Sequence, residues 1–165
     1  MNIQSELSSD LKISRIITGL WQIADMERDG DLDSKIFAKN IIPYVEAGLT
    51  TFDMADHYGT SELIIGEYNI ITPKSDLQLF TKWVPNSGKI KRQSVREAVE
   101  LALDRIKQTS IDLMQYHAWY YPDPSWLDAL LYLNELKEEG LIKHIGVTNF
   151  DSAHLRIACA SGIPI

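Results

Sequence analysis

The sequence predicts an α/β fold in which parallel strands alternate with helices. Short apolar runs typical of strands alternate about five times with stretches in which apolar residues recur at helical spacing. The predicted strands end near Trp21, Asp53, Lys82, His117 and Val147, roughly 30 residues apart, which is the size of one strand–helix–strand unit. Strands two to five are nearly continuous apolar runs, as expected for parallel strands that are covered on both faces.

Local signals place these elements in chain order. Helices are expected to begin at polar cap residues and to end at glycines. Pro43 lies inside the first predicted helix and should kink or split it, because proline cannot bond to the carbonyl of residue 39. The predicted strands are residues 13–21, 50–53, 77–82, 111–117 and 142–147. The predicted helices are residues 61–68 and those capped by Asp33 or Ser34, Ser94, Ser125 and Asp151, with Gly48, Gly140 and Gly162 as stops.

Two architectures contain such a pattern, the open doubly wound sheet and the (β/α)8 barrel. A dinucleotide-binding open sheet should carry a G-x-G-x-x-G turn after its first strand, but residues 21–25 read Trp-Gln-Ile-Ala-Asp. In a barrel, active sites lie at the carboxyl ends of the strands, where polar residues fall in this chain. We therefore predict a (β/α)8 TIM-barrel type. A full barrel takes about 250 residues, so the 165 residues should form an incomplete one, about the first five βα units in a single truncated domain, 1–165.

Composition excludes several classes of partner. The chain carries 16 lysine and arginine residues against 23 aspartate and glutamate residues, a net charge of −7, so neither nucleic acid nor an acidic membrane is an expected partner. The single cysteine, Cys159, cannot form an internal disulfide and is expected to be a small buried residue. The N-terminus resembles no targeting peptide, and no apolar run approaches the ~20 residues that span a bilayer. We expect a cytoplasmic protein.

Four residues with useful chemistry lie at or just after the ends of predicted strands: Asp53, Tyr58, Lys82 and His117. In a barrel these four should face one cavity. A nearby ammonium stabilises a phenolate, and a carboxylate paired with that ammonium fixes its position. An imidazole on the far side can donate a hydrogen bond to a developing oxyanion. Such a set suits protonation of a carbonyl oxygen while another group delivers a hydride.

The chain resembles the aldo-keto reductases. Residues 53–59, Asp-Met-Ala-Asp-His-Tyr-Gly, are similar to the family's Asp-x-Ala-x-x-Tyr-Gly. The resemblance continues in the family's order over nearly the whole chain, through Gly19-Leu20-Trp21, Ser61-Glu62, Thr81-Lys82, Ile111-Asp112-Leu113 with His117, and Ile145-Gly146-Val147-Thr148-Asn149-Phe150. It implies the N-terminal portion of an enzyme that transfers a hydride from NADPH, with NADH possible, to a small aldehyde or ketone.

The resemblance also implies a role for each residue. Tyr58 would be the general acid, Lys82 would tune its pKa, and His117 would orient the substrate carbonyl. Asp53 would pair with Lys82 and touch the nicotinamide ribose. The remaining implied contacts are those of Thr148 and Asn149 with the nicotinamide carboxamide, and those of Trp21 and Trp119 with the substrate.

Some features depart from the family pattern and leave alternatives open. Met54 stands where the family usually has threonine, Thr148 replaces the commoner serine, and the family's last strands, which hold most of the cofactor, are absent. The alternatives are a non-catalytic regulatory or binding relative of the same fold, or an inactive truncated fragment. The exposed edges of a partial barrel should favour self-association. His57 falls at a variable position and is expected on the loop surface, and no cysteine–histidine cluster indicates a metal site.

Overall fold

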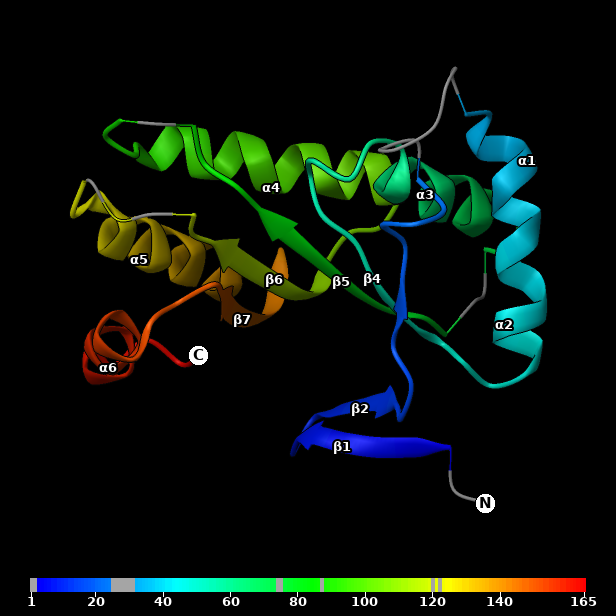
Figure 1. Ribbon diagram of the computed structural model, residues 1–165, viewed down its shortest axis with the longest axis horizontal. Coiled ribbons are helices and arrows are strands. Elements are labelled where there is room, and N and C mark those ends of the chain that lie inside the picture. The colour runs from blue at the N-terminus through cyan, green and yellow to red at the C-terminus, as the bar shows by residue number, and fades with distance from the viewer. Residues whose placement is uncertain (1–2, 25–31, 74–75, 87, 120, 122) are drawn as a thin grey trace.

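A five-stranded parallel sheet forms the centre of the computed structural model, which describes residues 3–24, 32–73, 76–86, 88–119, 121 and 123–165 (Figure 1). Each strand pairs in parallel with the next in the chain, so sequence order and spatial order coincide. This confirms the predicted α/β fold with parallel strands. The strands are β3 (Thr18–Gly19), β4 (Thr51–Asp53), β5 (Gln78–Trp83), β6 (Ile111–His117) and β7 (Ile142–Thr148).

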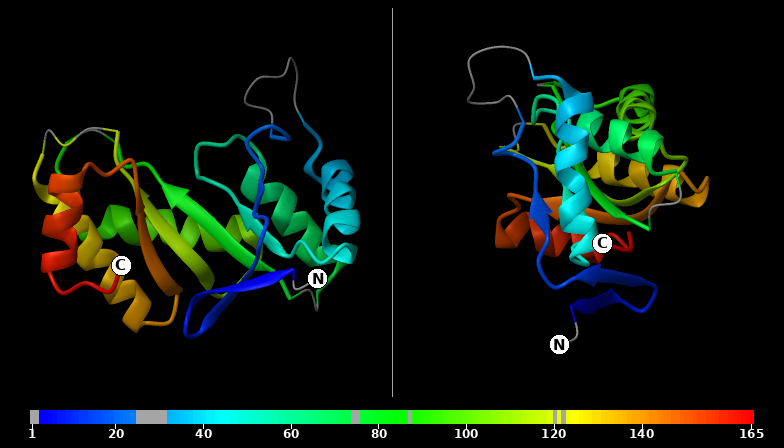
Figure 2. Two further views of the ribbon diagram at one scale, coloured as in Figure 1. Left: turned by 60° about the horizontal axis from the view of Figure 1, so that its bottom comes forward. Right: turned by 90° about the vertical axis from the view of Figure 1, so that its right-hand side faces the viewer.

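Helices connect the strands and pack against one face of the sheet (Figures 1 and 2). Pro43 lies in the first turn of α2, and a short 3-10 segment joins α1 to α2, so the first predicted helix is split as expected. The helical elements are α1 (Ser34–Ala38), η2 (Lys39–Ile41), α2 (Ile42–Glu46), α3 (Ser61–Ile71), α4 (Arg92–Ile106), α5 (Ser125–Glu138) and α6 (Ser152–Ala160). None of the helices in the described ranges is long and apolar enough to cross a membrane.

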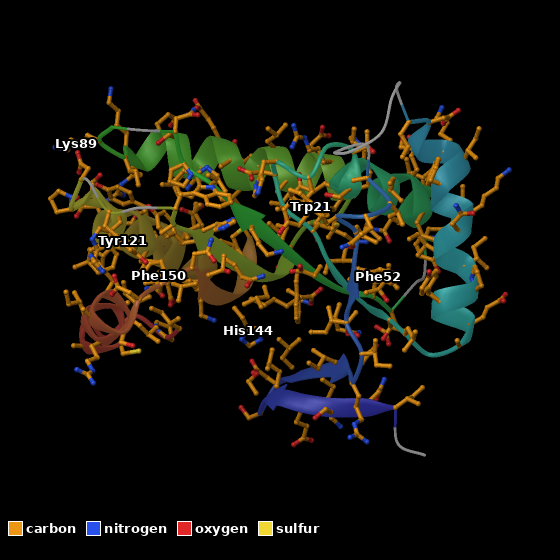
Figure 3. All side chains as sticks on the ribbon, in the orientation of Figure 1. Trp21, Phe52, Lys89, Tyr121, His144 and Phe150 are labelled. Carbon is orange, nitrogen blue, oxygen red and sulfur yellow. The ribbon has the colours of Figure 1, made fainter. Side chains whose placement is uncertain are left out.

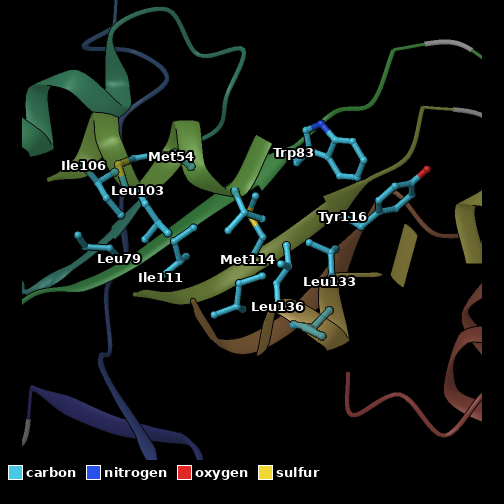
Figure 4. Close-up of a cluster of buried hydrophobic side chains, with 14 of the residues drawn as sticks. Met54, Leu79, Trp83, Leu103, Ile106, Ile111, Met114, Tyr116, Leu133 and Leu136 are labelled. Atoms are coloured by element: carbon cyan, nitrogen blue, oxygen red, sulfur yellow. The ribbon is translucent and has the colours of Figure 1, made fainter. Parts of the chain in front are cut away.

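The core lies between the sheet and the helices. Side chains of β5 and β6, including Leu79 and Met114, pack there against residues of α4 and α5 such as Ile106 and Leu133 (Figure 4). Successive side chains of a strand point to opposite faces. Because Leu79 enters this core, Lys82, three positions along β5, belongs to the other face, together with Phe80. The alternation thus turns the polar strand-end residues away from the helices.

The prediction of a first strand over residues 13–21 was wrong. Residues Leu11–Ser14 form β2, which pairs antiparallel with β1 (Gln4–Ser8), and only Thr18–Gly19 join the main sheet as β3. Leu11 and Ile13 point the same way from β2 and pack against Phe80 and Leu113. Burial of this apolar pair on the uncovered face of the sheet therefore explains why the segment forms a hairpin (Figure 2).

Helix caps and the cysteine give a mixed outcome. Asp33 and Asp151 cap their helices as predicted, each accepting a hydrogen bond from a backbone N–H of the first turn. Ser94 is not the cap of α4: it lies at the third helical position and its hydroxyl accepts from the N–H of the true cap, Lys91 (3.2 Å). Cys159 is exposed rather than buried, because its neighbour Ala158 occupies the buried position of α6.

Candidate active site

The centre of the candidate site is an ion pair between two neighbouring strands. Lys82 Nζ lies 2.6 Å from Asp53 Oδ2 and donates a second hydrogen bond to the carbonyl oxygen of Met54 (2.8 Å). Only 9% of the Lys82 side chain and 28% of the Asp53 side chain are exposed. The other carboxylate oxygen of Asp53 accepts a hydrogen bond from Gln115 Nε2 (3.3 Å). The ammonium is therefore fixed by two partners at the end of β4, and Gln115 on β6 holds the carboxylate that pairs with it.

Tyr58 lies beside this ammonium. The Lys82 Nζ atom is 4.8 Å from the centroid of the phenol ring, within the range of a cation–π contact. A tight turn after β4 holds the ring there, since the N–H of Tyr58 donates to the carbonyl of Ala55 (3.1 Å) and Gly59 follows with φ +48°. The edge of the Trp21 ring packs against the phenol at 4.7 Å between centroids. The turn and Trp21 together position the phenol toward the pair.

His117 ends β6 and contacts the loop after β7. Its Nε2 atom lies 2.7 Å from Nδ2 of Asn149, while its Nδ1 atom is buried without a hydrogen-bond partner in the described part of the chain. A proton on Nδ1 would leave a buried donor unpaired, at about 1–3 kcal/mol. We infer that the Asn149 amide is flipped, so that its oxygen accepts from a proton on Nε2 of His117. In that tautomer His117 is a donor on its accessible side.

The environment of His117 favours the neutral imidazole. Burial lowers its pKa, and the neighbouring His57 and Lys82 lower it further, while Asp56 acts in the opposite direction. The residue is 6% exposed. A neutral imidazole with a proton on Nε2 can donate a hydrogen bond without carrying a charge into the site.

Aromatic rings surround the site. Trp119 is 64% exposed, yet its ring packs against His117 at 4.7 Å between centroids. Trp21 belongs to the turn after β3 and packs against Tyr58 (Figure 3). His57 lies in the loop as expected, but it also packs among these rings, 5.3 Å from His117, and is therefore only partly on the surface. A cleft beside the His117–Trp119 contact is lined by Val84, Pro85, Asn86, Gly88, Ile90, Tyr116, Ala118, Asp123, Ser125 and Trp126.

The loop after β6 is fastened to the loop after β7. Tyr121 donates its hydroxyl proton to the carbonyl oxygen of Asn149 (3.0 Å), and its ring stacks on His154 at 3.6 Å between centroids. Its ring also packs edge-on against Phe150 (Figure 3). Asn149 has a left-handed backbone, with φ +61°, which places its carbonyl and side chain on this side of the strand. The hydrogen bond from Tyr121 therefore fixes Asn149 next to His117.

A buried carboxylate supports the Tyr58 loop from behind. Glu62 is 2% exposed, accepts a hydrogen bond from the Thr81 hydroxyl (2.6 Å) and pairs with Arg105 (3.1 Å). Arg105 also donates to the backbone carbonyl of Asp56 (3.3 Å). Burial raises the pKa of Glu62 and outweighs the lowering effect of Thr81 and Arg105. The cluster ties α3, α4 and β5 to the loop that carries the phenol.

The structure brings the predicted residues to one end of the sheet. Thr148 is opposite His117 in the parallel register of β6 and β7, and Asn149 follows it. Sequence reasoning missed Gln115 and gave no role to His57. Gln115 was accessible to prediction, because it lies two positions before His117 and so on the same face of β6.

Comparison with known proteins identifies the family. The sequence matches the model of the Aldo/keto reductase family over residues 15–165. The chain belongs to the aldo/keto reductase family. Met54, one of the departures from the expected pattern, is fully buried in the core.

Curated relatives include two bacterial reductases. The NADH-specific methylglyoxal reductase of Escherichia coli is 29% identical over an alignment that covers 90% of this chain and 52% of that protein. The 6-dehydroglucose reductase of Agrobacterium fabrum is 31% identical, with 87% and 52% covered. The chain thus spans about half the length of the curated relatives it matches.

Solved structures share the fold. A thermostable aldo-keto reductase crystallised with the inhibitor epalrestat has a TM-score of 0.85 and 26% identity, over 98% of this chain and 60% of its own. An aldo/keto reductase from Brucella melitensis has a TM-score of 0.77 and 25% identity, with the same coverage. The parallel sheet of this chain is therefore similar to part of the (β/α)8 barrel of that family, as predicted.

Proposed function

We propose that this chain carries the proton-transfer part of a nicotinamide-dependent reductase that converts aldehydes or ketones to alcohols. The observation that supports it best is the Lys82 ammonium, held between Asp53 and the Met54 carbonyl and 4.8 Å from the Tyr58 ring. An ammonium at that place stabilises a phenolate more than a phenol, so it favours release of the phenol proton. Tyr58 is then the general acid and Lys82 the group that tunes it.

His117 orients the substrate in this proposal. A carbonyl oxygen placed between the phenol and the imidazole accepts one hydrogen bond from each, and the Nε2 proton of the neutral imidazole then turns from Asn149 to the substrate. The carbonyl then becomes more electrophilic, and the Tyr58 proton has a short path to its oxygen. Trp21 and Trp119 supply the apolar walls on either side, which limits access of water to the developing charge.

The residues beside His117 fit a nicotinamide. The carboxamide of that ring needs a donor and an acceptor, and the side-chain amide of Asn149 offers both, with the Thr148 hydroxyl next to it. When bound, the dinucleotide supplies the hydride. We propose NADPH as the donor, with NADH as the alternative, and Asp53 as a contact to the ribose. Comparison of the dissociation constants of the two dinucleotides distinguishes them.

The test uses Tyr58→Phe in the purified protein. With NADPH and a panel of aldehydes, the variant should lose about 10²–10⁴-fold in kcat, the range of general acid catalysis. Its affinity for NADPH, measured by fluorescence titration, should stay within about threefold, because the hydroxyl is assigned to the substrate. Tyr44→Phe on α2 is the matched control, since that ring is 43% exposed and outside the site. Equal turnover by Tyr58→Phe and the parent protein would contradict the proposal, as would the absence of any aldehyde-dependent NADPH oxidation.

A further inference from the structure

His57 lies inside the candidate site, yet the proposed reaction gives it no task. Its orientation is fixed by Asp56, whose Oδ1 atom lies 2.8 Å from His57 Nδ1. The other carboxylate oxygen of Asp56 accepts a hydrogen bond from the N–H of Val84 (3.1 Å), and the N–H of Asp56 donates to the carbonyl of Lys82 (2.9 Å). The imidazole is therefore attached to the end of β5 through a carboxylate that has little freedom to move.

The ring is central among the groups that would surround a substrate. Its centroid is 4.8 Å from that of Tyr58 and 5.3 Å from that of His117, the two residues proposed to hold the carbonyl oxygen. Trp119 and Trp21 complete the surroundings at 6.2 Å and 6.4 Å. The side chain keeps 29% of its surface exposed, so a small ligand has access to it.

The bond to Asp56 determines what the ring can offer. A carboxylate only accepts hydrogen bonds, so the proton of the neutral imidazole is on Nδ1. Nε2 then carries a lone pair and is an acceptor. Tyr58 and His117 are both donors in the proposed reaction, which leaves His57 as an acceptor beside two donors. Two donors converge on a carbonyl oxygen, and an acceptor next to them suits a hydroxyl on the neighbouring carbon.

We propose that His57 selects substrates that carry a hydroxyl group next to the carbonyl, that is, 2-hydroxy aldehydes and 2-hydroxy ketones. The hydroxyl donates to Nε2 of His57 while the carbonyl accepts from Tyr58 and His117. Without this hydroxyl, Nε2 faces an alkyl group and loses a hydrogen bond in a partly dehydrated site. The proposal rests on the proposed function and narrows its substrate class.

The experiment compares two aldehydes of nearly equal shape, 2-hydroxypropanal and 2-methylpropanal, in which a methyl group replaces the hydroxyl. One neutral hydrogen bond is worth about tenfold in kcat/KM, so the parent protein should prefer the hydroxy aldehyde by about that factor. His57→Phe keeps a ring in place and should bring the ratio close to one. His57→Gln keeps an acceptor oxygen and should retain part of the preference. His144→Phe on β7 is the control, since His144 pairs with Asp10 away from these rings, and should keep the full ratio.

A binding measurement separates this inference from the proposed function. The amides 2-hydroxypropanamide and 2-methylpropanamide have a carbonyl that is not reduced, and their binding is followed by tryptophan fluorescence, to which Trp21 and Trp119 beside the site contribute. The parent protein should bind the hydroxy amide about tenfold more tightly, and His57→Phe should not. If that preference is present but neither aldehyde is reduced, the reductase proposal fails and the role of His57 stands. If both aldehydes are reduced and His57→Phe keeps the ratio of the parent protein, the role of His57 is overturned and the reductase proposal stands.

Discussion

Asp53→Asn should destabilise the protein because it leaves a buried ammonium without its counter-ion. Lys82 Nζ lies 2.6 Å from Asp53 Oδ2, and only 9% of the Lys82 side chain is exposed. Removal of one partner from a fully buried ion pair costs about 3–5 kcal/mol. Two features of this pair reduce the figure. Asp53 is 28% exposed, and the carbonyl of Met54 still accepts from Nζ at 2.8 Å.

The magnitude follows from what remains around the ammonium. The new amide keeps one oxygen that can accept from Nζ, so the substitution exchanges a charge-assisted hydrogen bond for a neutral acceptor. Bonds to charged groups contribute about 1.5–3 kcal/mol and neutral ones about 0.5–1.5 kcal/mol. This exchange accounts for about 1 kcal/mol, and the loss of the counter-ion of a largely buried charge adds about as much, so we expect Asp53→Asn to lower the free energy of unfolding by about 2 kcal/mol. Lys82→Met removes the charge itself, so Asp53→Asn should have a much smaller effect in that background.

The assay is a double-mutant cycle measured by urea unfolding with tryptophan fluorescence. The coupling energy between the two sites should be about 1.5 kcal/mol, within the range for residues in direct contact. Asp104→Asn is the control: Asp104 pairs with Lys107 at 2.9 Å, but their side chains are 74% and 45% exposed, so its loss should change stability by less than about 1 kcal/mol. If the effects of Asp53→Asn and Lys82→Met on the free energy of unfolding add within about 0.5 kcal/mol, then Asp53 does not stabilise the Lys82 ammonium.

Three further predictions concern packing and titration. Gly66→Ala should destabilise by about 1–3 kcal/mol in thermal unfolding, although alanine favours helices, because its Cβ would lie 1.9 Å from the carbonyl oxygen of Arg105. The raised pKa of Glu62 means that its contribution to stability is fullest below pH 4.5 and falls as pH rises through the folded pKa; urea unfolding across this range should show that Glu62→Gln removes the slope. The pKa of His117, measured by NMR, should lie below 6.5 and rise only partly in His57→Phe, because burial is the larger cause. Because the unfolded chain then binds a proton more readily than the folded one, the protein should lose stability as pH falls below about 6.5.

The fold was predictable wherever the apolar pattern had one interpretation. Residues 111–117 have apolar side chains at Ile111, Leu113, Met114 and Tyr116 between polar segments, and the predicted strand matches β6 in full. The pattern of residues 13–21 did not have a single interpretation. Ile13 and Ile16 read as parts of one strand, but Ile13 is buried against Phe80 whereas Ile16 is 65% exposed. Only the tertiary contact with β5 shows where the hairpin stops and the sheet begins.

The site was predictable where strand order alone brings residues together. Asp53 and Lys82 end neighbouring strands, so the parallel topology forces their ends to the same place. His57 belongs to a loop, and no strand periodicity defines the direction of its side chain. Its position depends on the hydrogen bond from Val84 to Asp56, a contact between segments 28 residues apart. Such contacts are properties of the folded loop and leave no regular pattern in the sequence.

The electrostatics of the site support the proposed division of labour between Tyr58 and His117. Both residues lie near the Lys82 ammonium. In the proposed reaction the phenolate of Tyr58 would form beside this cation, whereas burial, His57 and the same cation lower the pKa of His117. The proposed acid and a neutral imidazole can therefore lie next to one another. Asp53 affects the surroundings of both Tyr58 and His117, because it holds that cation in place.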